Sequence, residues 1–169
     1  MPVSFAVIND IPDLVFLINS AYRGDSSRKG WTTEADMVSG ELRTNEEHML
    51  ELMQRNDVVF LKYSNDEKEI EGSVFLQKRE GKLYLGMLSV SPYLQAKGIG
   101  KKLMAASEDY AREQDCPAIF MRVISIREEL IAWYERQGYY KTGEIKLFED
   151  GLFGTAKFNL EFVVLQKNI

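Results

Sequence analysis

The chain has 169 residues, of which 45% are hydrophobic and 28% are charged, a balance typical of a soluble globular protein. Its 21 basic and 26 acidic residues give a net charge of −5, which disfavours nucleic acid as a partner and mildly favours a cationic or neutral substrate. No apolar stretch approaches the roughly 18 residues of a membrane-spanning helix, so no membrane insertion is expected.

The N-terminal third is predicted to contain one strand and three helices. The strand is expected over residues 4–8. Asn9 or Asp10 can cap the first helix, because side chains of this type accept hydrogen bonds from the free N–H groups of a first turn. Two shorter helices are expected, one over residues 34–37 and one that follows a cap at Asn45.

The middle of the chain has β character. Strands are expected over residues 58–63, 70–76 and 83–90, which are rich in β-branched, aromatic and other apolar residues. Polar residues at 64–67 and a glycine at Gly81 mark the turns between them. Strands joined by such short turns pair in an antiparallel manner.

The last part of the chain alternates helices and strands. An amphipathic helix is expected from Ile99 to about Tyr110, with apolar residues at helical spacing that would pack on the sheet. The remaining elements are expected to be a strand over residues 117–124, a helix over 127–137 that Gly138 ends, and strands over 139–147 and 157–166.

A loop with two glycines joins the third central strand to the amphipathic helix. Gly98 and Gly100 leave backbone N–H groups uncovered, and the unbonded N–H groups of the helix start point the same way. The helix dipole adds roughly half a positive charge at this end. Three lysines add further positive charge: Lys97, Lys101 and Lys102. The loop is therefore predicted to hold a diphosphate.

Two common phosphate-binding patterns do not fit this loop. A Walker A loop requires Gly-x-x-x-x-Gly-Lys-Ser/Thr. Here Gln95 stands at the position of the first glycine, and Lys102 stands at the position of the Ser or Thr. A dinucleotide fingerprint requires Gly-x-Gly-x-x-Gly, and here Leu103 occupies the third glycine. What remains is Gln-x-x-Gly-x-Gly, and the alternative interpretation is an ordinary turn whose glycines permit tight packing.

Cysteine and histidine are too rare here for most metal sites. Cys116 and His48 are the only residues of their kinds and no carboxylate cluster stands out, so no metal is expected. A lone cysteine excludes an internal disulfide. Together with an N-terminus unlike a signal peptide, it favours a cytoplasmic location.

The Gln-x-x-Gly-x-Gly loop closely resembles the coenzyme A pyrophosphate loop of the GNAT superfamily of N-acyltransferases, whose pattern is Arg/Gln-x-x-Gly-x-Gly/Ala. The element order is also similar over nearly the whole chain, most specifically over residues 81–143. The resemblance implies one domain over residues 1–169 with an α/β fold, in which helices flank both faces of a mixed, mostly antiparallel sheet. It implies acetyl-coenzyme A as donor and an amine of a small molecule or peptide as acceptor.

The resemblance also implies which residues bind the cofactor. In the family, the strand before the loop splays from its neighbour, so that its backbone binds the pantetheine arm and one N–H polarises the thioester carbonyl. This donor maps onto the N–H of Leu88 or of a neighbour, and Gly86 fits a bulge or a close backbone approach in the same strand. Ser125 stands where many relatives have an asparagine that contacts the cofactor. Here the serine hydroxyl makes this contact or the contact is absent. The expected cofactor-binding residues are Leu88, Ser89, Val90, Gln95, Ala96, Lys97, Gly98, Ile99, Gly100, Lys101 and Ser125.

A second local match covers residues 130–139, where an aromatic-Tyr pair precedes a Gly-Tyr step. In many family members this tyrosine protonates the departing thiolate, and the matching residue here is Tyr134. The transfer is feasible because a phenol has a pKa of about 10 and a thiol one of about 8.5. Without the resemblance, Tyr134 would be interpreted as a core residue beside Trp133.

The group that deprotonates the acceptor is less evident. In the family, one wall of the acceptor site is formed by the segment that here contains Glu34, Asp36 and Glu41. Glu34 is the candidate base, and the alternative is that it is an ordinary solvent-exposed carboxylate. The connection over residues 148–154 is similar to an arm that either rims the pocket or joins a homodimer interface. A different function also stays open: a non-catalytic module that senses acyl-coenzyme A.

Overall fold

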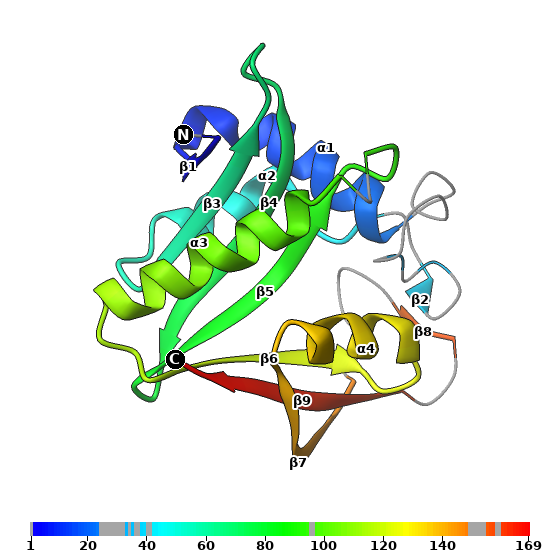
Figure 1. Cartoon of the computed structure of the whole chain (residues 1–169). Coiled ribbons are helices and arrows are strands. Elements are labelled where there is room, and N and C mark those ends of the chain that lie inside the picture. The colour runs from blue at the N-terminus through cyan, green and yellow to red at the C-terminus, as the bar shows by residue number, and fades with distance from the viewer. Residues whose placement is uncertain are drawn as a thin grey trace.

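One mixed sheet of seven strands forms the centre of the fold (Figure 1). The computed structural model describes residues 2–23, 33, 35, 38–39, 42–94, 97–148, 155–157 and 160–169. The strands of the sheet are β1 (Val3–Phe5), β3 (Val58–Ser64), β4 (Ile70–Arg79), β5 (Lys82–Val90), β6 (Ala118–Ile124), β7 (Tyr140–Leu147) and β9 (Glu161–Asn168). They lie in the order β1-β3-β4-β5-β6-β9-β7. Two short strands, β2 (Val38–Ser39) and β8 (Thr155–Ala156), pair separately.

Helices cover both faces of the sheet, as predicted. The α-helices in the described part of the chain are α1 (Ile11–Tyr22), α2 (Glu46–Met53), α3 (Ile99–Glu113) and α4 (Glu128–Arg136). Figure 1 shows α3 and α4 in front of the sheet and α1 and α2 behind it. None of the described helices combines the length and the hydropathy needed to cross a membrane.

Each face of the sheet has its own hydrophobic core. On one face, buried side chains of the strands pack against apolar residues of α3 and α4, such as Leu103 and Ile131. On the other face, Phe60 and Phe75 pack with residues of α1 and α2, such as Ile18 and Met49. Two buried faces explain why consecutive residues are buried in these strands rather than alternate ones, as over residues 72–77 of β4 and 88–90 of β5.

The first predicted strand is shorter than expected, because Ile8 starts a 3₁₀ helix (Ile8–Asp10). The Asp10 carboxylate accepts the N–H of Val7 at 2.8 Å and pairs with the Lys62 ammonium at 2.8 Å. Asp10 is therefore the N-cap of α1 by position but makes no side-chain capping bond. Asn45, by contrast, caps α2 as predicted: its side chain accepts the N–H of His48 at 2.8 Å.

The sheet opens between its two central strands. β5 and β6 are its one parallel pair, and their register joins only Leu83 with Ile119 and Tyr84 with Phe120. Beyond these residues the two strands diverge, as Figure 1 shows. The other pairs are antiparallel, which confirms the predicted mixed, mostly antiparallel sheet.

Candidate active site

β5 contains a bulge at the point where it leaves β6. Met87 and Leu88 lie opposite the single residue Val74 of β4, and Met87 has a φ of 48°. The Ser89 hydroxyl donates to the Met87 carbonyl at 2.9 Å and so closes the bulge. Gly86 directly precedes this bulge, and a Cβ there would lie 3.0 Å from the Tyr84 ring, so the neighbour that approaches it is a side chain rather than the backbone.

A cavity of about 670 Å³ lies where β5 and β6 diverge, within the usual size range of small-molecule sites. The β5 bulge and the second half of β6 form its walls. The ends of α1 and β7 and the start of α4 complete the lining. Two of the three predicted catalytic residues, Tyr134 and Leu88, border this cavity.

Tyr22 holds the bulge from the side of α1. Its hydroxyl donates to the Leu88 carbonyl at 2.6 Å, in a buried position. Leu88 itself belongs to neither the β4 nor the β6 register, since the bulge removes it from the ladder. The residue is buried, and its side chain belongs to the core on the α3 and α4 face. Sequence reasoning missed Tyr22, because its distance from residue 88 along the chain leaves no local signal.

Tyr134 lies on α4 and is 5% exposed. Its ring packs edge-on against Trp133, with centroids 5.1 Å apart, and against Tyr139, at 6.0 Å. Burial raises the pKa of the Tyr134 phenol well above its ordinary value, Tyr22 raises it further, and the positive charge of Arg127 opposes the shift. The phenol is therefore protonated at neutral pH.

The predicted diphosphate loop leads from β5 into α3. Gly98 is the N-cap of α3 with a φ of 78°, and a Cβ there would meet nothing within 4 Å. The first turn of α3 contains no acidic residue, and Lys97 and Lys101 are exposed beside it. Open space, free N–H groups and uncompensated cations fit a diphosphate. Gln95 and Ala96, also predicted in this loop, lie outside the described residues.

The other predicted cofactor residues take several roles. Ile99 and Gly100 are buried at the start of α3, and Val90 pairs with Gly72 of β4. Ser125 lies half-buried in the turn before α4, where its N–H donates to the Glu161 carbonyl at 2.8 Å, and it does not border the cavity. Glu34, Asp36 and Glu41 lie outside the described residues, as does most of the connection over residues 148–154.

Five basic residues that sequence reasoning also missed line the cavity: Arg23, Arg43, Arg122, Arg127 and Lys146. They come from the ends or edges of different elements, so no spacing in the sequence links them. Within the part of the chain that the structure describes, no group of three or more His, Cys, Asp or Glu side chains is placed to hold a metal ion.

Comparison of the sequence with known proteins gives two consistent matches. The sequence model of the Acetyltransferase (GNAT) family matches residues 18–139. The curated protein Acetyltransferase Atu2258 from Agrobacterium fabrum is 28% identical over 87 residues, which are 52% of this chain and 62% of that protein. The match thus spans less than two thirds of the relative.

Solved structures share the fold. The ribosomal-protein-S18-alanine N-acetyltransferase from Escherichia coli aligns with a TM-score of 0.73 at 14% identity, covering 99% of this chain and 92% of its own. The PaiA N-acetyltransferase from Thermoplasma acidophilum, solved in complex with coenzyme A, aligns with a TM-score of 0.69 at 17% identity over the whole of both chains. At these identities, the likeness establishes the architecture alone.

Proposed function

The chain belongs to the GNAT acetyltransferase family, and on this premise we propose that it transfers an acetyl group from acetyl-coenzyme A to an amine. One observation carries the proposal: β5 connects a loop open to a diphosphate with a bulge that faces a cavity beside Tyr134. The amine attacks the acyl carbon directly in a ternary complex, so no covalent cysteine is required. Cys116 is buried and lies outside the cavity lining.

The donor is held at two places along β5. Residues 97–101 offer the diphosphate their N–H groups and lysines, and Gln95 and Ala96 complete the loop by resemblance. The backbone of residues 88–90, which lies beyond the short register between β5 and β6, takes the pantetheine arm. Ser125 contributes at most a side contact from the turn before α4.

The acyl carbonyl accepts the N–H of Leu88 while negative charge grows on its oxygen. The bulge supports this assignment, because it takes Leu88 out of the ladder with β4. The hydrogen bond from Tyr22 to the Leu88 carbonyl restrains the adjoining peptide, so the donor is oriented before the reaction.

Tyr134 donates its proton to the sulfur as the carbon–sulfur bond breaks and the carbon–nitrogen bond forms. Burial raises the pKa of the phenol, and the same dry surroundings raise the pKa of the departing thiol, so the transfer stays feasible. The amine loses its own proton to solvent or to a carboxylate, for which Glu34 is the candidate.

Replacement of Gly98 tests the donor site. Gly98→Ala places a methyl group in the open space of the loop and is expected to raise the Kd of acetyl-coenzyme A about tenfold or more by calorimetry. Gly81→Ala is the matched control, because Gly81 has a φ of 80° and equally open space but lies in the β4–β5 turn.

Both variants should lose about 1 kcal/mol of stability from the left-handed backbone, but only Gly98→Ala should lose affinity. Equal affinities would contradict the diphosphate assignment. A thiol-release assay with a panel of amines then separates the enzyme from an acyl-coenzyme A sensor, since a sensor releases no coenzyme A above hydrolysis.

A further inference from the structure

The described lining of the cavity has a charge opposite to that of the whole molecule. The chain carries a net charge of −5, yet the described lining of the cavity contains four arginines, one lysine and no aspartate or glutamate. A cavity with walls of one sign concentrates ligands of the other sign. The site therefore calls for an anionic ligand group, whereas the net charge alone had favoured a cationic or neutral substrate.

Arg43 and Arg122 reach the cavity from two different elements. Arg43 precedes α2 and is half-buried, with its guanidinium 5.7 Å from the centre of the Tyr22 ring. Because Tyr22 bonds the Leu88 carbonyl, Arg43 lies near the proposed reaction centre. Arg122 lies on β6 between Met121 and Val123, whose buried side chains face α3 and α4. Alternation along the strand therefore directs Arg122 to the face of α1 and α2.

Carboxylates near the cavity offset only part of this charge. Lys146 pairs with Glu144 of β7 at 2.9 Å, so its charge is partly compensated. Burial lowers the pKa of Arg79, Tyr84 opposes the shift, and the positive charge of Arg122 lowers it further. Arg79 and Arg122 thus lie close enough to repel each other, while Asp57 acts on Arg79 and Glu144 on Arg122 to offset part of this charge.

The phosphates of the donor do not explain these cations. The diphosphate loop has its own lysines, at the start of α3 and on the opposite face of the sheet from Arg122. None of the described residues of that loop borders the cavity. The diphosphate therefore does not account for Arg43 and Arg122, which can serve the acceptor.

We infer that the acceptor is a small amine that also carries a carboxylate or a similar anionic group, as an amino acid does. Arg43 and Arg122 bind the anion, while the amine faces Leu88 and Tyr134. A guanidinium suits this task because its planar fork donates two parallel hydrogen bonds to one carboxylate. This inference rests on the proposed acetyl transfer and adds the acceptor class to it.

The test compares pairs of acceptors that differ in one group. Amino acids and their amides are assayed for thiol release with acetyl-coenzyme A, alongside aminophosphonates and a polyamine. We expect kcat/KM to be at least about tenfold higher for the acids than for their amides. Arg43→Gln and Arg122→Gln should each lower kcat/KM for the acids by about tenfold and so reduce the preference for acids over amides, with the KM of acetyl-coenzyme A unchanged.

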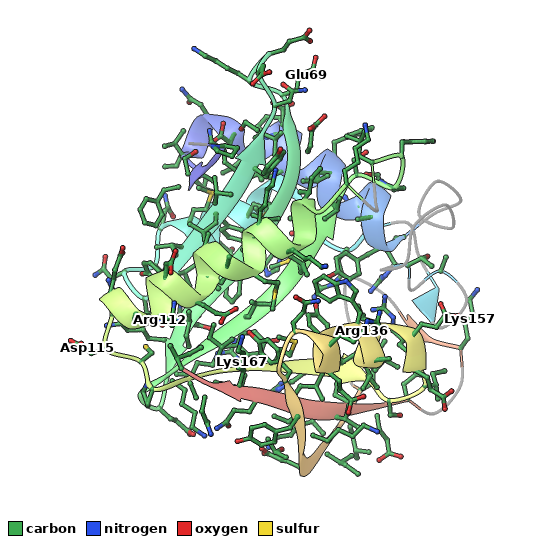
Figure 2. All side chains as sticks on the ribbon, in the orientation of Figure 1. Glu69, Arg112, Asp115, Arg136, Lys157 and Lys167 are labelled. Carbon is green, nitrogen blue, oxygen red and sulfur yellow. The ribbon has the colours of Figure 1, made fainter. Side chains whose placement is uncertain are left out.

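Arg136→Gln serves as the charge-matched control. Arg136 is exposed on α4, outside the cavity (Figure 2), so this variant should keep the preference for acids. Equal use of acids and amides, or a preference for the polyamine, overturns the acceptor class and leaves acetyl transfer standing. If acetyl-coenzyme A binds but no amine releases thiol, the proposed function fails and the acceptor class with it.

Discussion

Tyr134 and Tyr139 are buried and in contact. Removing one hydroxyl at a time therefore tests whether Tyr134 acts as the general acid. Tyr134→Phe keeps the ring contacts with Trp133 and Tyr139, so the fold should persist. Loss of the hydroxyl should lower kcat about a hundredfold, the range of general acid catalysis, with the Kd of acetyl-coenzyme A unchanged. Steady-state kinetics and calorimetry measure the two quantities.

Tyr139→Phe is the control, because the Tyr139 hydroxyl has no hydrogen-bond partner among the described residues. Its removal should leave kcat unchanged and stability equal or higher. Since burial raises the pKa of Tyr134, its phenol stays protonated to pH 10, and the rate ratio of wild type to Tyr134→Phe should be constant between pH 7 and pH 10. Wild-type turnover in Tyr134→Phe would leave this residue a packing role only.

At the residue scale, local motifs predicted what local contacts determine. The loop glycines and Tyr134 could be found because their neighbours along the chain carry the pattern. Tyr22, Arg43 and Arg122 could not, because the folded sheet brings them to the cavity from three distant elements. Their assembly depends on long-range packing, which no short spacing encodes.

At the scale of elements, the position of α3 depends on a glycine in the sheet below it. A Cβ at Gly72 of β4 would lie 2.8 Å from Ile99 Cγ2 and 3.0 Å from Leu103 Cδ1. Gly72→Ala should therefore lift the first turns of α3, with a loss of about 1–3 kcal/mol in the free energy of unfolding in urea. Because those turns carry the diphosphate N–H groups, the Kd of acetyl-coenzyme A should rise as well. Lower stability with unchanged affinity would contradict this coupling.

Elements were predictable where their own sequence decides their structure. The apolar spacing of α3 and the Asn45 cap of α2 are examples, since the contacts involved lie within a few residues. The β2–β8 pair escaped prediction because its strands have two residues each and lie far apart in the chain. The 3₁₀ turn at residue 8 escaped because Asp10 binds Val7 and Lys62 instead of capping α1.

At the scale of the whole molecule, the sheet consists of two parts with a short junction. β1, β3, β4 and β5 form one part and β6, β9 and β7 the other, joined only by the first residues of β5 (Figure 1). The divergence beyond this junction supplies the gap in which we place the pantetheine arm. A ligand in that gap can form hydrogen bonds with the strand backbones where the two strands do not bond to each other.

Donor binding should therefore stabilise the molecule as a whole. At a concentration of one hundred times its Kd, a ligand that binds only the folded state adds about 2.7 kcal/mol, which corresponds to a rise in Tm of roughly 5–10 °C for a chain of this size. Hydrogen exchange should slow most at residues 86–90 and in the first turn of α3, and least in β1 and β3. Protection confined to α3 would mean that the donor binds the loop without entering the gap. Only a ligand in the gap can form hydrogen bonds with the β5 backbone beyond its short register with β6.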